Sequence, residues 1–188
     1  MKKFAIILLI ISLNIHGQKK VLDHKDFDIW NRIQNSQISS NGDFIMYSLQ
    51  RGEEDSFLKI KDKNANLIFE HDRAEKGVFS YNSKHAIFVI KEWNDTITEM
   101  KRRKVKKEKM PMDSLGIYNL QNKTLVKISN VKSYKYPEKW SGYLAYTYDL
   151  TNKHKKDTIK EKKINKKPSS KNGYPLIIRN LDTEKEDT

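Results

Sequence analysis

The chain has 188 residues, a formal net charge of +13 at pH 7 and no cysteine. The absence of cysteine excludes disulfides, thiolate metal sites, cysteine nucleophiles and a lipid-modified N-terminal cysteine. Apolar residues make up only 37% of the sequence, but nine Tyr, seven Phe and three Trp can supply a core, so we expect a folded protein.

Residues 1–17 have the pattern of a signal peptide. Lys2 and Lys3 precede the apolar run "FAIILLIISL", which is too short to span a bilayer. We predict cleavage between Gly17 and Gln18, although the residues before this bond match the small-x-small rule imperfectly. A buried N-terminal strand or helix is the alternative. The prediction is an exported, periplasmic or extracellular protein of residues 18–188 without a membrane span.

A short helical turn is expected at Phe27 to Ile33, ahead of a weak internal repeat. The repeat is seen in "ISSNGDFIMYSL", "FSYNSKHAIFVIKE" and "YPEKWSGYLAYTYDL". In each copy a polar turn is followed by β-branched and aromatic runs that further turns separate.

The first two copies lie about forty residues apart, a spacing typical of four-stranded propeller blades. We therefore predict an all-β, incomplete β-propeller of about three blades, at about 36–70, 78–128 and 134–188. The third blade is predicted to lack its last strand. An antiparallel sandwich is the alternative. Three blades cannot close a ring, and open strand edges invite association.

The excess positive charge lies in two short stretches. Glu99 to Lys109 has a net charge of +5, and Asp149 to Lys171 has a net charge of +6. Both fall between the second and third strands of a repeat. The first can form an exposed helix, and the second is typical of a loop. Neither has the interleaved aromatic rings of a nucleic-acid surface, so we predict no nucleic-acid partner and consider anionic surface polymers instead.

Three segments carry a resemblance to a known family: "DHKDFDIWNRIQNSQISSNGDFIMYSL", "MPMDSLGIYNLQNKTLVKISNVKSYKYPEKWSGYLAYTYD" and "KNGYPLIIRNLDTEKED". They resemble the N-terminal part of exported bacterial serine peptidases of the prolyl oligopeptidase family. The resemblance implies a propeller that covers the active site of a following α/β-hydrolase domain and limits access to peptides. The G-x-S-x-G motif that holds the catalytic serine of such domains does not occur in this sequence.

We therefore predict no catalytic, cofactor-binding or metal-binding residues. Two S-x-x-K matches, Ser56 with Lys59 and Ser129 with Lys132, are expected by chance in so Lys-rich a chain, and the histidines have no ligand spacing. Large aromatic side chains are predicted to be buried anchors: Trp30, Trp93 and Trp140.

The predicted function is an access-controlling propeller segment that reaches peptide substrates only through a catalytic domain absent from these residues. The alternative is a stand-alone exported β-rich module that presents Lys-rich loops to acidic polymers or a protein partner.

Overall fold

A computed structural model of the chain describes residues 21–27, 29–148 and 174–188. The predicted signal peptide, its cleavage site at Gly17 and Gln18, and the whole of the second Lys-rich stretch lie outside these residues.

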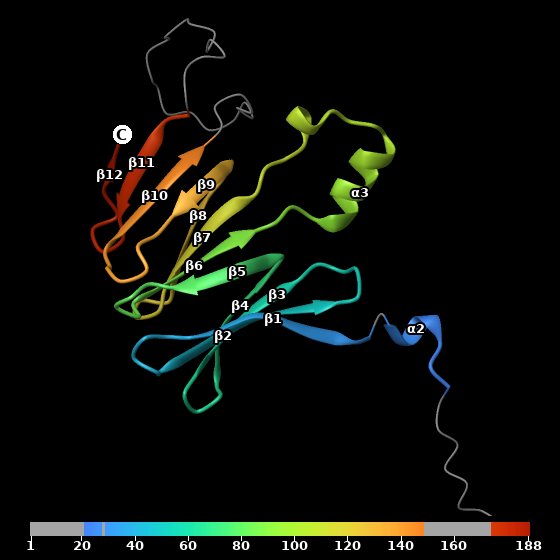
Figure 1. The fold of residues 1–188 in the computed structure, drawn as a ribbon, viewed down its shortest axis with the longest axis horizontal. Helices are drawn as coiled ribbons and strands as arrows, with labels where there is room; N and C mark the ends of the chain where they lie inside the picture. Colours follow the sequence, from blue (N-terminus) through green and yellow to red (C-terminus); the bar gives the residue numbers. More distant parts are fainter. Residues whose placement is uncertain (1–20, 28, 149–173) are drawn as a thin grey trace, which may run out of the picture.

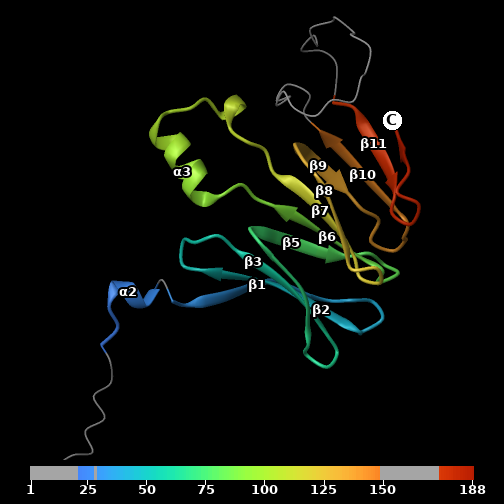
Figure 2. The same ribbon diagram turned by 180° about the vertical axis from the view of Figure 1, so that it is seen from behind.

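The described chain forms three antiparallel four-stranded sheets, which follow one another along the sequence and fan out side by side (Figures 1 and 2). Blade 1 consists of β1 (Asn31–Ile38), β2 (Phe44–Arg51), β3 (Phe57–Asp62) and β4 (Leu67–Asp72). Blade 2 consists of β5 (Ala74–Phe79), β6 (His85–Ile90), β7 (Ser114–Asn119) and β8 (Thr124–Ile128). Blade 3 consists of β9 (Val131–Lys135), β10 (Tyr143–Tyr148), β11 (Leu176–Asn180) and β12 (Glu186–Asp187). The prediction of an incomplete propeller with about three blades is confirmed.

The hairpin between the first two strands is built the same way in blades 1 and 2. The Ser39 hydroxyl oxygen accepts a hydrogen bond from the Phe44 amide at 3.0 Å, and Ser80 does the same for His85 at 2.9 Å. Gly42 lies in the left-handed region at φ +76°, where glycine has no steric cost. The repeated serine therefore fixes the hairpin register of both blades.

The core lies in the two seams between neighbouring blades. The seam between blades 1 and 2 buries residues from β2, β3, β6 and β7, among them Met46, Leu58, Ile60, Ala86, Phe88 and Tyr118. The seam between blades 2 and 3 buries Ile87, Leu115, Ile117, Leu144, Tyr146 and Ile177. Each sheet is thus held by the apolar face of the next sheet, as in stacked repeats.

The helices differ from the expected ones. The helical turn predicted at Phe27 to Ile33 is wrong from Asn31 onward: the observed helix is α2 (His24–Phe27), and Asn31 opens β1. A helix does overlap the first Lys-rich stretch: α3 (Asn94–Arg102) ends within it and is followed by the 3₁₀ turn η1 (Lys107–Lys109). Both lie between β6 and β7, the second and third strands of blade 2.

Two predictions about strands need correction. Each blade begins with a strand ahead of the runs recognised in the sequence, so the sheets occupy 31–72, 74–128 and 131–187. Blade 3 also has a last strand, because Arg179 and Ile178 of β11 pair with Glu186 and Asp187 of β12. That strand is only two residues long, and both residues are acidic, so no pattern of apolar residues predicts a strand there.

The prediction of three buried tryptophans is wrong. Trp30, Trp93 and Trp140 each expose about half of their surface. Trp93 lies over the Arg73 guanidinium, 4.2 Å from its carbon to the ring centroid, and Trp140 stacks on Tyr143 with ring centroids 5.2 Å apart. All three lie in connections outside the strands, where a large ring covers a neighbour without entering a seam.

Candidate functional site: an acidic pocket between blades 1 and 2

The long connections lie at one end of the strands. In a meandering sheet successive connections alternate between the two ends of the strands. The β2–β3 and β6–β7 connections are therefore at the same end as the β4–β5 connector that joins blade 1 to blade 2. We call this end of the fan the insertion rim. It also carries α3 and η1.

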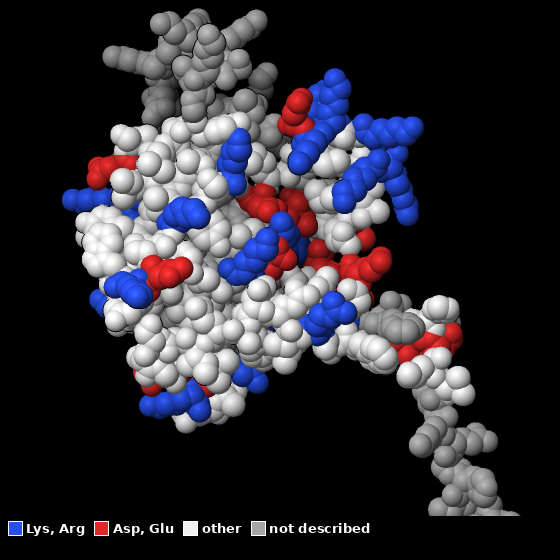
Figure 3. Space-filling view, viewed as in Figure 1, with Lys and Arg blue, Asp and Glu red and all other residues white. Residues whose placement is uncertain are grey.

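A pocket of about 360 Å³ opens at the insertion rim, over the seam between blades 1 and 2. Its charged lining consists of Glu53, Glu54, Asp55, Arg73, Glu75, Lys91, Glu92 and Asp113. Six carboxylates and two cations give these residues a formal charge of −4 in a chain whose net charge is +13. Figure 3 shows the acidic side chains gathered in a hollow beside α3. The local field is thus opposite in sign to that of the whole protein.

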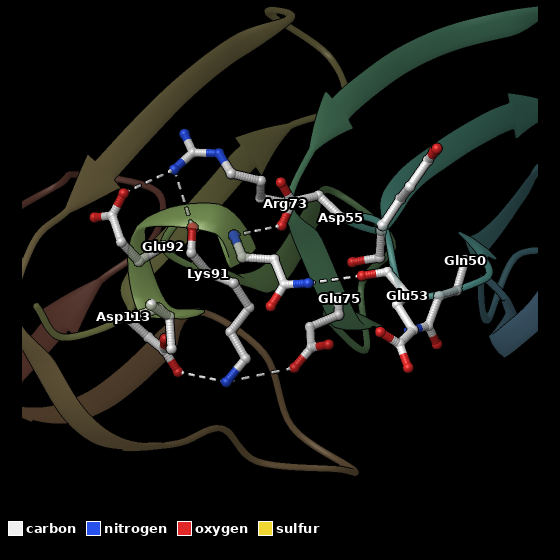
Figure 4. A pocket seen from close by; sticks show the side chains of 12 residues that line it. Gln50, Glu53, Asp55, Arg73, Glu75, Lys91, Glu92 and Asp113 are labelled. Atoms are coloured by element: carbon white, nitrogen blue, oxygen red, sulfur yellow. Dashed lines mark hydrogen bonds and ion pairs between the residues drawn. The ribbon is translucent and has the colours of Figure 1, made fainter. Parts of the chain in front are cut away.

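Lys91 crosses one side of the pocket (Figure 4). Its Nζ atom donates a hydrogen bond to Asp113 at 2.8 Å and lies 3.6 Å from a Glu75 carboxylate oxygen. Burial lowers the pKa of Lys91, but the hydrogen bonds and negative charges of Asp113 and Glu75 outweigh it, so the pKa lies above its ordinary value. Lys91 therefore stays charged and ties Glu75 of β5 to Asp113, the residue before β7.

Arg73 lines the pocket from the connector between blades 1 and 2. Its backbone is left-handed at φ +60°, and its side chain is largely buried. The guanidinium donates a hydrogen bond to the Lys91 carbonyl at 3.1 Å, lies 3.6 Å from Glu92, and packs against Trp93. This arrangement places the Arg73 cation against the segment Lys91 to Trp93 and gives the half-exposed Trp93 ring a cation to cover.

Asn94, the first residue of α3, makes two hydrogen bonds to blade 1. Its side-chain amide donates a hydrogen bond to the Glu53 carbonyl at 2.7 Å, and its backbone amide donates one to the Asp55 carboxylate at 3.0 Å. A carboxylate at the start of a helix is favourable, because the first amides have no partner within the helix. The insertion of blade 2 is thus anchored across the seam, and it forms one wall of the pocket.

The pocket has the chemistry of recognition by charge and hydrogen bonding. Ser56, its hydroxyl residue, donates its hydroxyl to the Ala74 carbonyl at 3.3 Å. No histidine lies among the lining residues, so the described pocket lacks a serine paired with a base.

The S-x-x-K matches do not come together as reactive pairs among the described atoms. Lys59 pairs with Glu70 across β3 and β4, with Nζ 3.4 Å from the carboxylate, and Lys132 lies over the Tyr174 ring. In the part of the chain that the structure describes, no three His, Asp or Glu side chains are grouped to hold a metal ion. None of the described helices is both long and apolar enough to cross a membrane.

The pocket was not predicted. Five of its six acidic residues lie in three short segments that connect strands at the insertion rim, "GEEDS", "HDRAE" and "KEWND", and the sixth, Asp113, directly precedes β7. Aligning these connections, rather than the strands, would have drawn attention to them. The residues are far apart in sequence, and only the stacking of two blades brings them together.

Comparison with known proteins places the fold. No family model and no curated protein sequence matches the chain. Among solved structures, the β-propeller domain of the trilobed protease from Pyrococcus furiosus matches with a TM-score of 0.51 and 12% identity, covering 85% of this chain and 42% of that one. At this identity the likeness shows the fold alone, which is that of a propeller domain. The chain spans less than half of that domain.

Two other matches have lower scores. The acylaminoacyl peptidase from Pyrococcus horikoshii gives a TM-score of 0.49 at 12% identity, covering 88% of this chain and 25% of that one. A eukaryotic initiation factor gives a TM-score of 0.44 at 14% identity, covering 89% of this chain and 34% of that one.

Proposed function

We propose that the chain is the N-terminal, access-controlling propeller segment of an exported serine peptidase of the prolyl oligopeptidase type. It is not catalytic by itself. Peptide substrates are cleaved at an active site in a hydrolase domain outside these 188 residues. The observation that carries the proposal is the succession of three four-stranded blades, matched by the propeller domain of a protease.

The physical basis of access control is steric. A ring of rigid sheets around a narrow passage admits an extended peptide, whereas a folded protein is too wide to enter. The blades of this chain meet the need for rigidity, because two continuous apolar seams hold them together. The long connections at the insertion rim supply variable contacts without disturbing those seams.

The test begins with the coding sequence after the Thr188 codon. An open frame that contains G-x-S-x-G, followed by an Asp and then a His, is expected. The longer product should cleave short peptides and leave folded proteins intact, and the 188-residue chain should cleave neither. A coding frame without these motifs, or peptide cleavage by the 188-residue chain, would contradict the proposal.

One observation favours the alternative, a stand-alone module that binds acidic polymers. Seven exposed cations lie on or directly after α3: Lys101, Arg102, Arg103, Lys104, Lys106, Lys107 and Lys109. Figure 3 shows several of these cations projecting away from the blades. Such a cluster attracts polyanions by simple Coulomb forces, which salt weakens.

A further inference from the structure

The connection between β6 and β7 carries a basic finger, which we define as residues 94–109, from the start of α3 to the end of η1. It contains seven lysines and arginines against three carboxylates, Asp95, Glu99 and Glu108, so its net charge is +4. The finger and the pocket with its formal charge of −4 lie at the same rim. In Figure 3 the cations project from a lobe beside the hollow that holds the acidic side chains.

The cations of the finger are available to a partner. All seven are exposed, and among the described residues only Arg103 has an ion-pair partner, Glu99 one helical turn earlier. In the described part of the chain none of the seven pairs with a carboxylate of the pocket, although Ile97 of α3 lines it. Arg73 and Lys91 pair with carboxylates of the pocket instead. A ligand can therefore bind these cations without displacing a carboxylate of the protein, Glu99 apart.

The backbone holds the cations in an ordered array. The helix ends in a Schellman motif, in which the Lys104 amide donates to the Lys101 carbonyl at 2.9 Å and the Val105 amide donates to the Met100 carbonyl at 3.0 Å. At its other end α3 is anchored to blade 1 through Asn94. Because the array is ordered before a ligand arrives, little of the interaction energy is lost in ordering it on binding.

Lys104 occupies the position in this motif that glycine normally fills. Its φ of +54° is left-handed, where a side chain is unfavourable and glycine is not. Residues strained in this way cluster at functional sites. Lys123 has the same conformation, at φ +55°, in the turn between β7 and β8 at the opposite end of the strands. The two lysines form a matched pair, of which only Lys104 lies within a cluster of cations.

The acidic pocket limits what can bind to the finger. Its carboxylates lie beside α3, and within the described residues the side chains of Glu53 and Glu54 have no ion pair. An anionic polymer that extends from the finger over the pocket meets like charge, whereas a short acidic run does not. Polypeptides can carry short acidic runs with neutral flanks, but polyphosphate and acidic glycans are charged along their whole length. The arrangement thus favours a peptide over a uniformly charged polymer.

We propose that the basic finger binds a short acidic run of a polypeptide, through its cations between residues 101 and 109. Charge-assisted hydrogen bonds to the Asp and Glu side chains of the ligand supply the binding energy, as in other acidic motifs read by clustered cations. The inference rests on the proposed function in taking the ligand to be a peptide substrate, which the finger holds at the insertion rim. Binding is measured on the 188-residue chain without a hydrolase domain. The coding-frame experiment can therefore fail while this one succeeds, and the reverse also holds.

Fluorescence anisotropy of a labelled peptide with a central run of glutamates tests the proposal. The Kd should rise with added salt, and a peptide with Gln in place of every Glu should not bind. Lys104→Gly should raise the Kd about two- to fivefold through the loss of one exposed charge pair, with equal or greater stability in urea. Lys123→Gly removes the same charge from the same backbone conformation, so it is the matched control and should leave the Kd unchanged.

A longer ligand tests the limit that the pocket sets. Glu53→Gln combined with Glu54→Gln should tighten the binding of long polyglutamate and leave that of the short run unchanged, because only the long ligand reaches the pocket. No effect of this double variant on long polyglutamate would contradict the preference for a short run. Equal losses of affinity in Lys104→Gly and Lys123→Gly, or equal binding of the Glu and Gln peptides, would overturn the proposal. Binding of polyphosphate with which the Glu peptide does not compete would assign the finger to acidic polymers instead.

Discussion

Gly77 of β5 lies directly against Met46 of β2: a Cβ atom on Gly77 would be 2.5 Å from the Met46 sulfur and 2.7 Å from Leu58 Cδ1. Blade 2 approaches blade 1 this closely only because residue 77 has no side chain. Gly77→Ala should therefore overpack the seam and lower the free energy of unfolding by about 1–3 kcal/mol. Urea denaturation measures the change.

Met46→Ala provides the control for this prediction. It lowers stability by itself, because Met46 is fully buried, but it also removes the atoms that the new methyl group would contact. The double variant should be less destabilised than the sum of the two single variants. Additive losses would show that the two blades do not meet at this pair.

His85 makes stability depend on pH. Its side chain is buried at the seam between blades 2 and 3, and its Nδ1 atom has no hydrogen-bond partner among the described residues. Burial, and then the charge of Lys84, lower the pKa of His85 below the ordinary 6.5, against the opposing charges of Asp182 and Glu184. The folded protein therefore binds a proton at His85 less readily than the unfolded chain does.

This contribution to stability is complete above pH 6.5 and is lost as the pH falls toward the lower pKa of the folded state. The free energy of unfolding should fall more steeply with acid in the wild type than in His85→Gln, which cannot titrate. Urea titrations between about pH 7.5 and about pH 5.5 measure the two slopes. Equal slopes would contradict the prediction.

Arg73 should be the most sensitive residue of the pocket. Arg73→Met keeps the bulk of the side chain but removes the hydrogen bond to the Lys91 carbonyl, so a loss of about 1.5–3 kcal/mol is expected. Trp93→Ala removes the ring that covers the guanidinium. A double-mutant cycle on thermal or urea unfolding should give a coupling of about 0.5–1 kcal/mol between the two residues. No coupling would mean that Trp93 and Arg73 do not interact in solution.

The basic residues around α3 should control retention on an anionic matrix. A variant in which Lys101, Lys104, Lys106 and Lys107 are replaced by Gln should elute at lower salt, with unchanged stability because all four are exposed. The matched control replaces four exposed lysines elsewhere by Gln: Lys63, Lys123, Lys127 and Lys139. Equal shifts in the two variants would show that net charge, rather than this cluster, decides retention.

The repeat could be predicted because its second and third strands carry strong patterns. The strands β2 and β6, which contain Met46 and Phe88, are short runs rich in apolar and aromatic residues, and polar turns bound these runs. The first strands escaped notice: β1 reads "NRIQNSQI" and is almost entirely exposed, so it has no alternation of apolar and polar residues. Its place in the sheet depends on hydrogen bonds to β2, which no hydropathy pattern reports.

The exposure of the tryptophans and the presence of the pocket could not be predicted from the sequence, for a different reason. Trp93 is large and apolar, and burial is the usual expectation, but the partner it finds is the cation of Arg73, twenty positions earlier. The acidic side chains around Lys91 likewise come from both blades. Contacts of this kind arise only when the blades stack, and the local sequence does not contain that information.

Every strand in the three sheets is hydrogen-bonded to its immediate neighbour along the chain. Most of the pairing therefore closes short loops, and the entropy cost of those hairpins is small. A blade can form as soon as its own four strands have been synthesised, and each finished blade then offers a surface on which the next one condenses. Vectorial, N-to-C acquisition of structure on the ribosome follows directly from this meander, and the long connections before β7 and β11 delay only the second halves of blades 2 and 3.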